Sequence, residues 1–180
     1  TSVSGGSGID DVTLTDASGN TVDLAGVEVI TGSDGDDILT VTDDTSVMVD
    51  GGDGADTLIG NAGDDTLLGG LGSDTLIGGG GADVVDGGQD DDLLELDGSA
   101  GVTAEGGDGR DTVVLVGETN EASLSGVEVV VGSAGDDSVT VSTNDIEAIS
   151  GGEGFDDVTL TDASGNTVAL AGVEVITGSD

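Results

Sequence analysis

Residues 51–86 read GGDGADTLI, GNAGDDTLL, GGLGSDTLI and GGGGADVVD when the chain is cut every nine residues. Each piece opens with six glycine-rich residues that end in aspartate, and it closes on three residues whose middle member is apolar. Glycine reaches the positive φ angles that tight turns need, whereas Val, Leu and Ile favour short strands. The stretch therefore predicts a repeating unit made of one turn and one three-residue strand.

The nine-residue unit extends over almost the whole chain. Good matches begin at Gly5, Gly32, Gly51, Gly60, Gly69, Gly78, Gly106, Gly132 and Gly151. The piece from Gly87 keeps Asp92 at its sixth place, and degenerate pieces begin at Leu14, Asp23, Val41 and Leu96. The middle strand residues are Val12, Leu39, Leu58, Leu67, Leu76, Val85, Leu94, Val113, Val139 and Val158. One apolar residue per strand cannot stabilise a hairpin, so we expect the units to stack into a solenoid.

A longer repeat is superimposed on the short one. Residues 4–34 and 150–180 agree at all but three positions, with an offset of 146 residues. This offset is sixteen nonapeptides plus two residues, and sixteen is divisible by two but not by three. The repeat therefore favours a two-sided coil of about 18 residues over a three-sided coil of about 27. We expect residues 1–180 to form one continuous roll, an excerpt of a longer tandem array.

The composition restricts the chemistry. The 180 residues include 39 Asp and Glu but one Lys or Arg and no His, which gives a net charge of -38, and there is no Cys. This charge repels nucleic acid and anionic membrane surfaces, no apolar run is long enough to span a membrane, and no His or Lys can activate the Ser and Thr hydroxyls. High charge with one aromatic residue is also typical of disorder, so we expect the metal-free chain to be largely unstructured.

The pieces GGDGADTLI, GNAGDDTLL, GGLGSDTLI and GGGGADVVD closely resemble the nonapeptide G-G-x-G-x-D-x-U-x of the repeats-in-toxin (RTX) family. The resemblance implies an all-β, right-handed parallel β-roll. It implies that Ca²⁺ lies between turns one coil apart, held by sixth-place Asp side chains and by backbone carbonyls of the glycine-rich turns. It also implies export from a Gram-negative bacterium, with folding delayed until calcium is met outside. The degenerate pieces from Leu14, Leu96, Val141 and Leu160 are expected to bind nothing.

The residues themselves also favour calcium. Carboxylates and turn carbonyls form the all-oxygen donor set that Ca²⁺ prefers, Mg²⁺ demands a tight octahedron, and Zn²⁺ lacks its Cys and His ligands. Binding needs good turns on the same side of the roll, which are alternate nonapeptides. One side then carries the predicted ligands Asp37, Asp56, Asp74, Asp92 and Asp111. The other side carries Asp65 with Asp83, Asp137 with Asp156, and Asp10 with Glu28 as its partner.

The sequence favours a structural function outside the cell or at its surface: a calcium-stabilised filament, stalk or surface-layer component that folds on binding several Ca²⁺ ions and associates with itself or with tandem neighbours. An accessory secretion or binding module of a larger adhesin, toxin or hydrolase is the main alternative, and a soluble calcium buffer is a third. Adjacent acids such as Asp36 and Asp37 recur as turn elements, so no enzyme is expected. Neither an ice-binding threonine array nor a calcium bridge to anionic polysaccharide has specific support.

Overall fold

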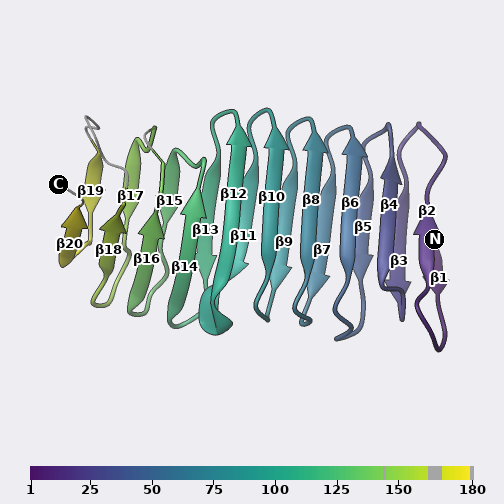
Figure 1. Cartoon of the computed structure of the whole chain (residues 1–180), viewed down its shortest axis with the longest axis horizontal. Coiled ribbons are helices and arrows are strands. Elements are labelled where there is room, and N and C mark those ends of the chain that lie inside the picture. The colour runs from purple at the N-terminus through teal and green to yellow at the C-terminus, as the bar shows by residue number, and fades with distance from the viewer. Residues whose placement is uncertain (144, 162–167, 179–180) are drawn as a thin grey trace.

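The chain forms two parallel β-sheets that face each other along one axis (Figure 1). The computed structural model describes residues 1–143, 145–161 and 168–178. Sheet A contains β1 (Ser2–Ser4), β3 (Thr21–Ala25), β5 (Ile38–Val41), β7 (Thr57–Asn61), β9 (Thr75–Gly79), β11 (Leu93–Asp97), β13 (Thr112–Val116), β15 (Val129–Val131), β17 (Ala148–Ser150) and β19 (Ala169–Ala171). Sheet B contains β2 (Asp11–Thr13), β4 (Val29–Ser33), β6 (Met48–Asp53), β8 (Thr66–Leu71), β10 (Val84–Gln89), β12 (Val102–Asp108), β14 (Asn120–Ser125), β16 (Asp137–Val141), β18 (Asp157–Leu160) and β20 (Val175–Gly178).

The strands alternate between the two sheets, so two nonapeptides make one coil. Leu58 in β7 pairs with Leu76 in β9, which lies 18 residues later. Leu94 in β11 pairs with Val113 in β13, one coil further on. Every pairing in the two sheets is parallel, and the successive coils lie side by side along the long axis (Figure 1). The two-sided parallel β-roll with about 18 residues per coil is therefore confirmed.

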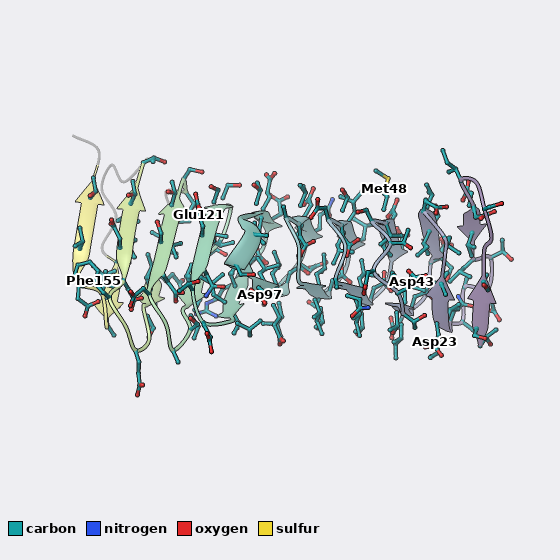
Figure 2. All side chains as sticks on the ribbon, turned by 90° about the horizontal axis from the view of Figure 1, so that it is seen from below. Asp23, Asp43, Met48, Asp97, Glu121 and Phe155 are labelled. Carbon is teal, nitrogen blue, oxygen red and sulfur yellow. The ribbon has the colours of Figure 1, made fainter. Side chains whose placement is uncertain are left out.

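The core is a column of aliphatic side chains between the sheets. Leu58, Leu67, Leu76, Leu94 and Val113 are fully buried. Polar side chains on the outer faces of the sheets project outward (Figure 2). Val12 alone among the predicted middle residues is half-buried, because β2 lies in the first coil. Every strand from β3 to β18 thus buries at least one apolar residue against its neighbours, which makes up for the missing aromatic anchors.

Truncating this column should be costly. We expect Leu67→Ala to lower the free energy of unfolding by about 2–5 kcal/mol, because the cavity cannot collapse between fixed coils. Denaturant titration in saturating calcium measures the effect. Leu71→Ala, at a side chain that is 42 % exposed in the same strand, is the matched control and should change stability by less than about 0.5 kcal/mol. Equal losses in the two variants would contradict the assigned core.

The long sequence repeat returns the chain to the same sheet. Strands β2 and β18 occupy equivalent places in the two copies, and both belong to sheet B. Strands β3 and β19 are likewise both in sheet A. The two copies of the duplicated segment therefore lie on the same sides of the roll, as the even number of nonapeptides predicts.

Candidate functional site

The sixth-place residues before sheet A form one row along the roll. Row A consists of the residues directly before the strands from β3 to β15: Asn20, Asp37, Asp56, Asp74, Asp92, Asp111 and Glu128. Each of the first six donates its backbone N–H to the side-chain oxygen of the next, over 2.6–2.8 Å. One carboxylate oxygen per coil is therefore used to link neighbouring coils.

Row B repeats this arrangement at the starts of the sheet B strands, with two interruptions. Its members are Asp10, Glu28, Val47, Asp65, Asp83, Asn120, Asp137, Asp156 and Glu174. The corresponding hydrogen bonds measure 2.8–3.1 Å and form three segments. Asp10 donates its N–H to Glu28, Val47 donates to Asp65 and Asp65 to Asp83. In the third segment Asn120 donates to Asp137, Asp137 to Asp156 and Asp156 to Glu174. A short 3-10 turn, η1 (Gly98–Ala100), lies between the Asp83 and Asn120 coils, so row B has separate segments.

Seven aspartates of these rows keep one buried oxygen without a partner. Their Oδ1 atoms accept the N–H of the preceding coil, whereas their Oδ2 atoms have no hydrogen-bond partner among the described residues; they are Asp56, Asp65, Asp74, Asp83, Asp92, Asp111 and Asp156. All seven side chains are at most 3 % exposed. A buried, unpaired carboxylate oxygen is strongly unfavourable, so these atoms require a cation or a proton. We call their turns open.

A second oxygen lies beside each of several open carboxylates. A Cβ atom built on Gly51 would contact Oδ2 of Asp56 and would lie 2.7 Å from the carbonyl oxygen of Gly69, one coil further on. Gly69 stands in the same relation to Asp74 and to the carbonyl of Gly87. The first-place glycine is needed because any side chain would fill this space. A carboxylate oxygen and a carbonyl oxygen of adjacent coils thus converge there.

This donor set fits a hard divalent cation. Ca²⁺ takes six to eight oxygen ligands from carboxylates, carbonyls and water in adaptable geometry. Among the described residues, no three acidic side chains form a group that could hold a metal by themselves. Backbone carbonyls would have to complete any coordination, which is the carbonyl-rich type of site that the resemblance implies.

The pKa values of the open carboxylates also indicate that each of these groups requires a cation or a proton. Burial first, and neighbouring carboxylates to a smaller extent, raise the pKa of Asp56, Asp65 and Asp74 to about 6 and that of Asp92 to about 7. The pKa values of Asp83, Asp111 and Asp156 are also raised, with burial as the main cause. A cation between the coils would favour the ionised form that burial opposes.

All ten predicted ligands lie in the two rows, but three of them differ from the rest. The Oδ2 atom of Asp10 accepts the N–H of Gly6 at 2.8 Å, and Asp37 and Asp137 accept the N–H groups of Ser33 and Ser133 at 2.8 and 2.7 Å. We call these turns closed. Metal binding by any of the ten remains a prediction.

Several row members escape a search for the nonapeptide. Glu128 and Glu174 accept the N–H groups of Asp111 and Asp156, as Glu28 does for Asp10. Each glutamate is the third residue of a shorter turn of sequence Gly-Val-Glu-Val, in which the glycine adopts a φ angle of +56° to +59°. The longer glutamate side chain takes the acceptor position that aspartate has in the six-residue turn. This threefold GVEV repeat is the sequence signal; Asn20 and Asn120 have none within the nonapeptide pattern.

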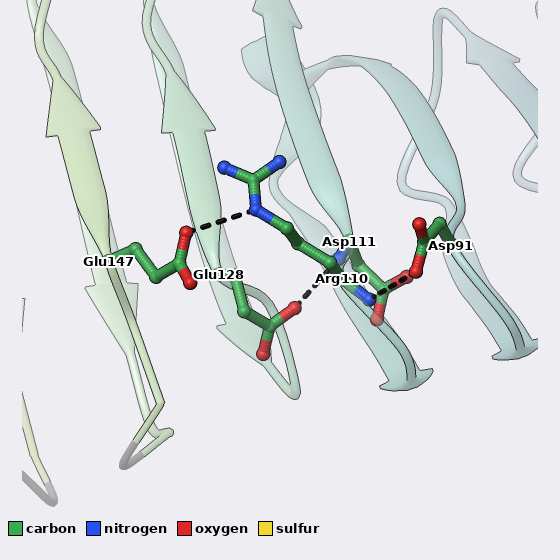
Figure 3. A network of polar contacts seen from close by, with 5 residues as sticks. All are labelled: Asp91, Arg110, Asp111, Glu128 and Glu147. Atoms are coloured by element: carbon green, nitrogen blue, oxygen red, sulfur yellow. Dashed lines mark hydrogen bonds and ion pairs between the residues drawn. The ribbon is translucent and has the colours of Figure 1, made fainter.

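The fifth-place acids form an outer row of contacts. Asp36, Asp64, Asp91 and Asp136 accept backbone N–H groups from the next coil on the same side, at 2.8–3.0 Å. Figure 3 shows one case, in which Asp91 accepts from the N–H of Arg110 beside the bond from Asp111 to Glu128. The Arg110 side chain pairs with Glu147 at 3.0 Å, and both are more than half exposed. Local charge relief accounts for this contact.

The family model of the RTX calcium-binding nonapeptide repeat matches four segments of the chain, at residues 24–44, 48–76, 59–94 and 68–102. This part of the chain belongs to the RTX repeat family. The RTX segments include six of the ten predicted ligands: Asp37, Asp56, Asp65, Asp74, Asp83 and Asp92. Comparison with curated proteins and with solved structures finds no match.

RTX repeats bind calcium, and these repeats therefore form a calcium-binding structural module rather than a member of a catalytic family. The described residues contain no pocket for an organic substrate. Within the same residues, no helix is long and apolar enough to cross a membrane.

Proposed function

We propose that this chain is a structural repeat of an extracellular protein, a stalk, filament or surface-layer component whose roll becomes rigid when Ca²⁺ binds between its coils. The seven buried Oδ2 atoms without partners carry this proposal, because they recur along the roll and, in all the turns except that of Asp83, a carbonyl of the next coil lies beside them. Each ion would join two successive coils. Binding and folding would then be a single equilibrium.

Different observations support the extracellular location and the function as an elongated structural unit. Calcium modules with carbonyl-rich sites of moderate affinity operate at the calcium concentrations found outside cells. The 146-residue repeat brings each copy back to the same sheets, so tandem copies would continue one straight roll. Ten strands at about 4.8 Å spacing give a length on the order of 50 Å for this segment. Such a rod would serve as a spacer or an assembly unit.

Three variants at two positions of one coil test the ligand assignment. We expect Asp74→Ala to weaken calcium binding by about tenfold or more, since it removes an open Oδ2 and losing even a supporting group costs about that much. Asp86→Ala, at the ninth place of the next unit and half-buried on the outer face of sheet B, should leave affinity unchanged. Asp74→Asn retains the Oδ1 acceptor for Asp56 and separates metal binding from the coil-linking hydrogen bond. Calorimetric titration with CaCl₂ measures all three; equal affinities would refute the assignment.

A further inference from the structure

Two closed turns share a cluster that the open turns lack. The first clasp consists of Asn20, Ser33 and Asp37 in row A, and the second clasp consists of Asn120, Ser133 and Asp137 in row B. In each clasp the serine occupies the second place of the turn. The asparagine occupies the row position of the preceding coil, where six of the seven open turns have aspartate and the turn of Asp65 has Val47.

The first clasp saturates its carboxylate with donors from the protein. Oδ1 of Asp37 accepts the backbone N–H and the side-chain Nδ2–H of Asn20 at 2.6 and 2.8 Å. Oδ2 accepts the N–H of Ser33 at 2.8 Å and lies 3.0 Å from its hydroxyl. A carboxylate offers about four lone-pair positions; backbone and amide N–H groups fill three of them on Asp37, and the Ser33 hydroxyl, which lies 3.0 Å from both Oδ2 and the carbonyl oxygen of Asp16, is the donor available for the fourth. Oδ2 of Asp74, in contrast, has no partner.

The second clasp repeats these contacts 100 residues later. Asn120 donates from N and Nδ2 to Oδ1 of Asp137 at 3.1 and 2.7 Å. Ser133 donates from N to Oδ2 at 2.7 Å, and its hydroxyl lies 3.0 Å from Oδ1. The Asn120 amide also reaches the Ser133 hydroxyl at 3.1 Å, as Asn20 reaches Ser33. Independent turns on opposite sides of the roll thus have the same design.

The backbone at the second place separates the two classes of turn. In all seven open turns this residue has a φ angle between +81° and +114°; the residues are Gly52, Asn61, Gly70, Gly79, Gly88, Gly107 and Gly152. Among the described residues, Asn61 and Asp90 are the only ones other than glycine with positive φ, so Ser33 and Ser133 lie outside this region. Their N–H groups point at Oδ2 instead. A β-carbon disfavours positive φ, so serine holds its turn closed.

We propose that the two clasps are calcium-independent junctions, in which an asparagine amide and a serine replace the cation that the open turns need. The inference rests on the proposed function and separates the predicted calcium ligands into two classes. Asp37 and Asp137 bind no calcium, whereas the seven open aspartates do. The second-place residue selects the state, since serine permits only the closed turn. Gly6 at the Asp10 turn shows that glycine also accommodates the closed one.

The clasp has a sequence rule of its own. Asn20 and Ser33 are 13 residues apart, and so are Asn120 and Ser133. The sequence contains the same spacing again at residues 166 and 179, which lie outside the described residues. The 13-residue spacing of asparagine and serine therefore recurs within the duplicated segment.

Counting bound calcium tests the clasps. We compare the parent chain with Asp37→Asn and Asp74→Asn by equilibrium dialysis against saturating CaCl₂ and elemental analysis, with circular dichroism to confirm folding. Asp37→Asn should bind as many ions as the parent chain, whereas Asp74→Asn should bind at least one fewer. Loss of calcium in both variants overturns the clasps alone. No bound calcium in any chain overturns the proposed function and the division of sites with it.

A second variant adds a gain of function in case Asp37→Asn fails to fold. Asn20→Asp combined with Ser33→Gly restores the residue types of an open turn and places two carboxylates in adjacent coils. The double variant should bind one more calcium ion than the parent chain, and Ser33→Gly alone should not, because Asn20 still donates its amide to Asp37 and supplies no second carboxylate. An unchanged count in the double variant overturns the role of Asn20 and Ser33 as selectors.

Discussion

Chelating calcium with EDTA at pH 7 should convert the folded roll into a largely disordered chain. Without a cation, seven buried carboxylate oxygens lack a partner, and the net charge of -38 opposes compaction. Each site at about 100 times its dissociation constant contributes roughly 2.7 kcal/mol to the folded state, so several sites together exceed the stability of a typical domain. Far-UV circular dichroism and sedimentation velocity should both report the transition.

Magnesium separates specific binding from charge screening in this experiment. Adding MgCl₂ back to the chelated chain should restore little structure, because Mg²⁺ retains its waters and requires a tight octahedron. Adding CaCl₂ should restore the β-sheet signal fully. Identical spectra with EDTA and with calcium would contradict coupled binding and folding, and equal recovery with magnesium would contradict a calcium-specific site.

Acidification should partly replace calcium. The pKa of Asp56, Asp65 and Asp74 is about 6 in the folded chain and that of Asp92 is about 7, against about 3.9 for an unfolded aspartate. The folded state therefore binds more protons between about pH 4 and pH 7. By linkage, the stability of the metal-free chain is greatest below this interval and falls as the pH rises through the folded pKa values.

With calcium present the pH dependence should reverse. Calcium must displace the protons from these aspartates, so its affinity, and the stability that it adds, should increase as the pH rises through about 6–7. Urea titrations at several pH values, with EDTA or with CaCl₂, measure both slopes. Slopes of the same sign in the two series would show that the open aspartates are not the groups that exchange protons for metal.

Most of the fold follows from residues that repeat. The apolar middle residues, such as Leu58 and Leu76, predict the core and the stacking, and the even number of nonapeptides in the 146-residue repeat predicts the two sides. The assignment of Asp56 and Asp65 to different sides follows from the same alternation and agrees with the sheet order. These features are predictable because each depends on spacing alone.

The differences among the turns depend on backbone orientation, which spacing does not reveal. The pattern treats Asp37 and Asp74 as equivalent, yet one carboxylate is saturated and the other has an open oxygen. The cause lies at neighbouring positions that the motif leaves variable, the second-place Ser33 and Asn20 on the preceding coil. Glu128 was missed for a related reason, since its shorter turn breaks the nine-residue spacing while keeping the hydrogen bond to Asp111.

Anomalous diffraction from crystals grown in CaCl₂ tests the central claim most directly. We expect calcium peaks between adjacent coils within coordination distance of the Oδ2 atoms of the seven open aspartates, and none at Asp37 or Asp137. Peaks confined to the outer fifth-place acids, or the absence of any peak between coils, would contradict the account.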